Sequence, residues 1–135
     1  MWPAGYPQTL GTKMNYKKIL LVDDSATSRM IIKRCFKIAG FQDSEYFEAE
    51  NGLDALTFFE ENNSADLIVT DLNMPKMDGN NLIKKLKVND VTKEIPVVII
   101  SSMGEELIEK ELHEIGVKGI IKKPINPAKI ILIIP

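Results

Sequence analysis

In this chain, acidic residues directly follow two of the short apolar segments, and a lysine follows another. Asp23 and Asp24 come after the first such segment, and Asp71 comes after the third. Lys123 comes after the last. Carboxylates that lie a few Å apart repel one another, so three of them ionise together only when a cation neutralises them. Oxygen ligands suit Mg²⁺, and no nearby His or Cys favours zinc. These residues therefore predict a divalent metal site.

The same residues could also hold a phosphoryl group. Lys123 supplies a compact positive charge for a phosphoryl oxygen, and the Ser101 hydroxyl, which follows a fourth apolar segment, supplies a hydrogen bond. A carboxylate can itself act as the nucleophile and form an aspartyl phosphate. Asp71 is the best-placed candidate for that role.

Short apolar segments alternate with amphipathic stretches of ten to fifteen residues, and this pattern indicates βα units that form a parallel sheet. In such a sheet, ligands bind beyond the carboxyl ends of the strands, which would bring the residues above together. The predicted strands are 18–22, 44–49, 66–70, 96–100 and 119–122, and the predicted helices are 25–39, 53–62, 81–87, 102–115 and a last one from 127.

The composition describes one ordinary domain, because 135 residues with 44% hydrophobic content bury a single core. Seventeen basic residues stand against 19 acidic ones, which disfavours nucleic-acid binding by this chain. The longest apolar run, 130–134, is far shorter than the ~20 residues of a membrane span. A single cysteine fits a reducing cytoplasm, which is the expected location.

The first fifteen residues contain two Pro and two Gly and no hydrophobic periodicity. They lack the basic start and apolar block of a signal peptide. We interpret 1–15 as a disordered, vector-derived leader, because a second methionine, Met14, stands just before the first patterned segment. The domain is then expected to span 16–135.

Four motifs in order resemble the receiver domain of bacterial two-component response regulators: LLVDDS at 20–25, DLNMPKMDG at 71–79, IISS at 99–102 and KKP at 122–124. The resemblance covers about residues 16–134. It implies a flavodoxin-like, doubly wound α/β fold whose five parallel strands have that family's order, 2-1-3-4-5. It also implies a phosphorylation-dependent signalling switch rather than a turnover enzyme.

The resemblance assigns a role to each acidic residue. Asp71 would accept a phosphoryl group from a phosphohistidine on a sensor histidine kinase or phosphotransfer protein. Asp24 and Asp71 would hold Mg²⁺, with Mn²⁺ as an alternative, and Asp23 would act largely through a metal-bound water. The backbone carbonyl of Asn73 would complete the protein ligands of the metal.

Four further residues take roles from the same resemblance. Lys123 would bind a phosphoryl oxygen, and Ser101 would move to hydrogen-bond it. The small Ser102 leaves the phosphoryl site accessible, and Pro124 is the family's cis-peptide position. The output is expected to be contact with a downstream protein target.

One position departs from the family pattern. The family usually has Tyr or Phe in the fifth strand, coupled to the Ser/Thr hydroxyl, and the matching residue here is Ile120. We expect Ser101 still to respond, with a surface change that is smaller or lies elsewhere. Equal changes at that face in the Ile120 and Ile120→Tyr proteins would contradict this.

Two other functions use similar residues. A haloacid-dehalogenase-type phosphatase also has an Asp nucleophile and Mg²⁺, but it needs Asp-x-Asp, and this chain has Asp71-Leu72-Asn73. A pseudo-receiver that is never phosphorylated would normally have lost an acidic residue or the lysine. The kinase, the target and the pathway, whether chemotaxis or a phosphorelay, stay open.

The end of the chain conflicts with the family pattern. Residues 130–134 are all apolar, so a short surface helix from Pro127 would have no polar face. Two readings are open: the chain is truncated here, or the apolar tail is buried against a neighbour in an oligomer or a swap. We therefore predict a short or atypical last helix, with a strand-like form or an exchange between chains as the alternatives.

Overall fold

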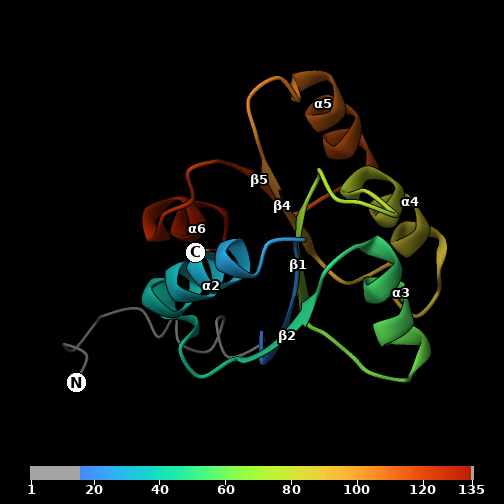
Figure 1. The fold of residues 1–135 in the computed structure, drawn as a ribbon, viewed down its shortest axis with the longest axis horizontal. Coiled ribbons are helices and arrows are strands. Elements are labelled where there is room, and N and C mark those ends of the chain that lie inside the picture. The colour runs from blue at the N-terminus through green and yellow to red at the C-terminus, as the bar shows by residue number, and fades with distance from the viewer. Residues whose placement is uncertain (1–15, 135) are drawn as a thin grey trace, which may run out of the picture.

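A computed structural model describes residues 16–134 of the protein. Five parallel strands form one sheet in the order β2-β1-β3-β4-β5, which confirms the predicted α/β fold and strand order (Figure 1). The strands are β1 Lys18–Val22, β2 Glu45–Ala49, β3 Leu67–Asp71, β4 Val97–Ser101 and β5 Gly119–Lys122. The helices are α2 Ala26–Phe36, the π-helical turn η1 Lys37–Phe41, α3 Gly52–Glu60, α4 Gly79–Val88, α5 Glu106–Ile115 and α6 Pro127–Ile133. The predicted leader, 1–15, lies outside the described residues.

Helices cover both faces of the sheet, which explains why its strands read as continuous apolar runs. Figure 1 shows α2 and α6 on one side and α3, α4 and α5 on the other. In β1, Ile19 and Leu21 belong to the core under α2 and α6, whereas Leu20 and Val22 belong to the core under the other three helices. No helix in the described part of the chain is long and apolar enough to span a membrane.

Helix α5 begins four residues later than predicted, at Glu106. Gly104 has a φ of 90°, a left-handed conformation that keeps this part of the chain out of the helix. Half of the predicted capping box is present, because the Ser102 N–H donates to the Glu105 carboxylate. The residues between β4 and α5 therefore form a loop at the edge where the predicted site lies.

The last helix, α6, is short, as predicted, with seven residues, but the expectation that this element is strand-like or exchanged between chains was wrong, because α6 is a regular helix packed on its own sheet. Its first turn is capped by Asn126, whose side chain accepts from the Lys129 N–H at 2.9 Å. Ile130 and Ile134 are buried in the core beneath α2, and Ile133 packs against it. This i, i+3, i+4 spacing gives even a seven-residue helix an inner face, so neither a strand nor an exchange between chains is needed.

The packing of α6 predicts unequal effects within its apolar run. We expect Ile130→Ala to lower the free energy of unfolding by about 2–4 kcal/mol, because Ile130 is 0% exposed and its loss leaves a cavity. The matched change Leu132→Ala, at a residue 83% exposed, should cost less than about 0.5 kcal/mol. Urea unfolding of both variants measures this difference. Equal losses would mean that α6 does not pack in this way.

Candidate functional site

Three carboxylates meet at the carboxyl edge of the sheet. Asp23 and Asp24 follow β1, Asp71 ends β3, and these strands are neighbours. One oxygen from each carboxylate lies within 4.8 Å of the other two. Asp23 and Asp71 are buried and Asp24 is exposed, so the cluster is open to solvent on the side of Asp24.

Two neighbouring serines hold the Asp23 carboxylate in place. Its Oδ1 accepts from the Ser25 N–H at 2.9 Å, and its Oδ2 accepts from the Ser28 hydroxyl at 2.6 Å. Both bonds arise in the first turn of α2, so they are local in sequence. Both oxygens of the Asp23 carboxylate therefore have protein partners, which fix its orientation at the cluster.

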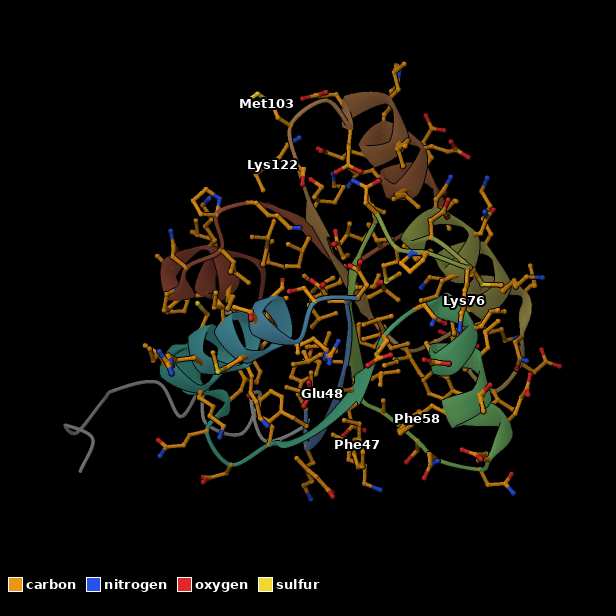
Figure 2. The ribbon with its side chains drawn as sticks, viewed as in Figure 1. Phe47, Glu48, Phe58, Lys76, Met103 and Lys122 are labelled. Atoms are coloured by element: carbon orange, nitrogen blue, oxygen red, sulfur yellow. The ribbon has the colours of Figure 1, made fainter. Side chains whose placement is uncertain are left out.

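A buried arginine, which our sequence analysis did not single out, supports the same segment. The Arg29 guanidinium donates to the backbone carbonyl of Asp23 and pairs with Glu48 at 2.7 Å. Figure 2 shows Glu48 on β2, beside β1. Arginine is rarely buried without such partners, but this pairing joins residues 19 positions apart and leaves no local sequence signal.

Both carboxylate oxygens of Asp71 accept hydrogen bonds, and both bonds favour its ionised form. Oδ1 accepts from the Leu72 N–H at 2.8 Å, and Lys123 Nζ donates to Oδ2 at 3.3 Å. Burial raises the pKa of Asp71 above its ordinary value; Lys123 opposes this, and Asp23 adds to it. The carboxylate is thus costly to ionise unless additional positive charge lies nearby.

Gly79 allows the segment after β3 to fold back closely on Asp71. A Cβ at Gly79 would collide with the backbone carbonyl oxygen of Asp71. The Gly79 N–H donates to Leu72 O at 3.0 Å, and Asp78 caps α4 by accepting from the Asn81 N–H at 2.9 Å. These contacts fix the segment that presents Asp71.

The serines predicted for the site lie at the end of β4 and just beyond it. Ser101 is the last residue of β4 and is fully buried, and its hydroxyl donates to Glu109 Oε2 at 2.8 Å. Ser102 follows it and is partly buried. Our sequence analysis did not find Glu109, which lies on α5.

The other predicted positions lie in the segment after β3, within β5 and just after it. Asn73 is exposed in the segment after β3, and Ile120 is partly buried in β5, opposite Ile99 of β4. The peptide bond between Lys123 and Pro124 is cis. Lys123 has a 38% exposed side chain, so it reaches the acidic cluster from the solvent side.

The donor set of the cluster fits a hard cation such as Mg²⁺. All three convergent groups are carboxylates, and the exposed Asp24 leaves an approach for an ion that keeps several of its waters. The cation would also stabilise the ionised form of Asp71, which burial and, to a lesser degree, the Asp23 charge make costly.

Asp71→Asn should raise the melting temperature of the metal-free protein by a few degrees at pH 7. The pKa of Asp71 is raised in the folded protein, so the protonated carboxyl group contributes its full stability to the fold below the ordinary pKa of 3.8. This contribution is lost as the pH rises through the folded-state pKa, and Asn, which stays neutral, does not lose it. The gain in the variant should therefore shrink as pH falls toward 4. Melting curves in a chelator, with exposed Asp43→Asn as the control, measure it. A lower melting temperature for Asp71→Asn would contradict the stated cost of burial.

Comparison with known proteins agrees with this geometry. Residues 19–135 match the family model of the response regulator receiver domain. The chain is 37% identical over 110 residues to the chemotaxis protein CheY1 of Helicobacter pylori strain J99, covering 82% of this chain and 87% of that protein. It is 35% identical to the chemotaxis protein CheY of Bacillus subtilis, covering 84% and 91%.

Solved structures show the same likeness. A response regulator receiver domain protein from Clostridium thermocellum superimposes with a TM-score of 0.74 at 28% identity, covering 87% of this chain and 90% of that one. The chemotaxis response regulator CheY4 of Vibrio cholerae superimposes with a TM-score of 0.71, also at 28% identity, covering 87% and 94%. By its sequence, its strand order and its acidic cluster, the chain belongs to the family of response regulator receiver domains.

Proposed function

We propose that the protein is a phosphorylation-dependent signalling switch in which Asp71 accepts a phosphoryl group from a phosphohistidine. One observation carries this proposal: an oxygen of the buried Asp71 carboxylate lies within 4.8 Å of oxygens of two other carboxylates, and its Oδ2 lies 3.3 Å from the Lys123 ammonium. This arrangement offers a nucleophile, a cation site and a fixed positive charge within one small region.

In the transfer step, an Asp71 oxygen attacks phosphorus, a P–O bond forms, and the P–N bond to the imidazole breaks with its electron pair returning to nitrogen. Lys123 binds a phosphoryl oxygen, and Ser101 donates a hydrogen bond to another. Mg²⁺, when bound by Asp24, Asp71 and the Asn73 carbonyl, supplies further neutralisation of the phosphoryl charge. Asp23 would contribute to holding the metal through a water molecule, and the small Ser102 leaves room for the donor.

The partners follow from this chemistry. The donor is a sensor histidine kinase or a phosphotransfer protein, and the recipient of the signal is a downstream protein that reads a changed surface. The relatives named above are chemotaxis proteins, which makes a diffusible regulator of that kind one candidate role. The cytoplasm is the expected compartment.

Intact-mass analysis after incubation with acetyl phosphate and Mg²⁺ tests the proposal. We expect one phosphoryl adduct on the natural chain, sensitive to hydroxylamine as an acyl phosphate is, and none on Asp71→Asn. The control Asp43→Asn, at an exposed position, should be modified like the natural chain. A hydroxylamine-resistant adduct that persists in Asp71→Asn would overturn the assignment, and repeated turnover of a phosphate ester would favour a phosphatase.

A further inference from the structure

The hydroxyl group of Ser101 is held by a charged group on α5. Ser101 Oγ donates to Glu109 Oε2 at 2.8 Å, and Lys122 Nζ of β5 contacts the same carboxylate oxygen. Lys122 also reaches the Glu106 carboxylate at 3.5 Å and the Ser102 carbonyl at 3.4 Å. Figure 2 shows Lys122 beside the loop that leaves β4 for α5, so three elements meet at this contact.

The Ser101–Glu109 hydrogen bond is largely shielded from water. Ser101 is fully buried, and the Glu109 side chain is only 15% exposed. A hydrogen bond to an ionised acceptor is stronger than one between neutral groups, and burial strengthens it further. The contact therefore fixes the Ser101 rotamer and ties the end of β4 to α5.

A serine hydroxyl carries one proton, so it donates to one acceptor at a time. In this structure that acceptor is Glu109. If Asp71 is phosphorylated as proposed above, the phosphoryl oxygens need the same proton. Ile120 of β5 has no polar side-chain atom, so it can neither accept the Ser101 hydroxyl proton nor donate a proton in its place.

We propose that Glu109 is a positioning residue that competes with the phosphoryl group on Asp71 for the Ser101 hydroxyl. Phosphorylation moves this hydrogen bond from Glu109 to a phosphoryl oxygen and so releases the tie between β4 and α5. Lys122 keeps the Glu109 carboxylate paired after Ser101 has left. This inference rests on the proposed function, because it assigns the regulation of the same site.

Competition of this kind has a thermodynamic consequence. Glu109 accepts the Ser101 hydrogen bond only in the unphosphorylated arrangement. It therefore stabilises that arrangement relative to the one in which Ser101 donates to a phosphoryl oxygen. Removing the Glu109 acceptor should therefore favour the phosphorylated arrangement. The same coupling lets α5 respond to phosphorylation without an aromatic residue in β5.

Titration with beryllofluoride and Mg²⁺, which together mimic the phosphoryl group, measures the effect as a dissociation constant. We expect Glu109→Ala to bind about tenfold to 100-fold more tightly than the natural chain, the range that matches the net worth of one hydrogen bond to a charged group. The control Glu114→Ala, which removes the same charge from an exposed position on α5, should change binding less than about twofold. Nuclear magnetic resonance of the Ser101 amide should shift in Glu109→Ala toward its bound position before beryllofluoride is added.

Repeating the Glu109→Ala change in a Ser101→Ala protein separates the effect of the hydrogen bond from the effect of the Glu109 charge. In Ser101→Ala, the change Glu109→Ala should no longer tighten binding, because the contact that it removes is already absent. Equal tightening in both backgrounds would overturn the inference. Glu109→Gln keeps a hydrogen-bond acceptor but removes the charge, so its affinity for beryllofluoride should lie between the affinities of the natural chain and of Glu109→Ala. This variant replaces Glu109→Ala in the test if the alanine variant fails to fold.

The outcomes distinguish this inference from the proposed function. If the natural chain binds no beryllofluoride, or if Asp71→Asn binds it with the same affinity as the natural chain, the proposed function fails and this inference fails with it. If the natural chain binds through Asp71 but Glu109→Ala binds equally or more weakly, only the role of Glu109 is overturned. Tighter binding that depends on Ser101 supports it.

Discussion

Lys123→Met is expected to slow phosphorylation of Asp71 by acetyl phosphate about 100-fold. Lys123 Nζ lies 3.3 Å from Asp71 Oδ2, where it can bind the oxygen of an incoming phosphoryl group. Removing one fixed group that stabilises charge in a transition state typically costs that much rate. Lys123 also opposes the raised pKa of Asp71, so its loss leaves less of the nucleophile ionised. The rate of adduct formation by intact mass measures this effect.

Methionine is unbranched like lysine and nearly as long, and it removes the charge and the hydrogen-bond donors of the ammonium. The matched control is Lys118→Met, at an exposed lysine just before β5, which should react at the rate of the natural chain. A loss of less than about threefold in Lys123→Met would show that this ammonium does not take part in the transfer.

Withdrawal of divalent cations is the second change with a large expected effect. A chelator should reduce phosphorylation by acetyl phosphate about 100-fold or more, because three clustered carboxylates would then repel the phosphoryl oxygens without compensation. Asp24→Asn should raise the Mg²⁺ concentration for half-maximal phosphorylation at least about tenfold, since it removes an exposed ligand and leaves Asp71 intact.

Titration of Mg²⁺ against the phosphorylation rate gives both results. The control Asp43→Asn carries the same substitution at an exposed position outside the acidic cluster, and it should leave the Mg²⁺ requirement unchanged. Full phosphorylation in a chelator would contradict a role for the acidic cluster as a cation site. So would an Mg²⁺ requirement that is the same in Asp24→Asn and the natural chain.

The sheet and the convergence of the acidic residues could be predicted because both depend on local patterns. Apolar runs buried on both faces mark the strands, and the residue that follows each run must lie at one edge of the sheet. Asp23, Asp24 and Asp71 therefore came together in the structure as their positions in the sequence implied. The strand order itself came from the family resemblance.

Two features were beyond sequence reasoning because they depend on side-chain contacts between separate elements. Glu109 reaches Ser101 only because α5 begins late and lies against the end of β4. Arg29 is buried only because Glu48 of the neighbouring strand pairs with it. Neither partner can be identified from spacing along the chain.

The last helix shows a different limit. The all-apolar run 130–134 suggested an element without a polar face, and we expected it to leave its own sheet. In the structure, Ile130, Ile133 and Ile134 face the core while Leu132 is left exposed. An apolar side chain on the surface is common in folded proteins, so a missing polar face does not exclude a surface helix.

A crystal structure of the protein with Mg²⁺ and beryllofluoride tests the central claim most directly. We expect beryllium bonded to a carboxylate oxygen of Asp71, a fluorine within hydrogen-bonding distance of Lys123 Nζ, and Mg²⁺ held by Asp24 and Asp71. Beryllofluoride bound at another residue, or Mg²⁺ bound away from the acidic cluster, would contradict the account of this edge of the sheet as a phosphoryl-accepting site.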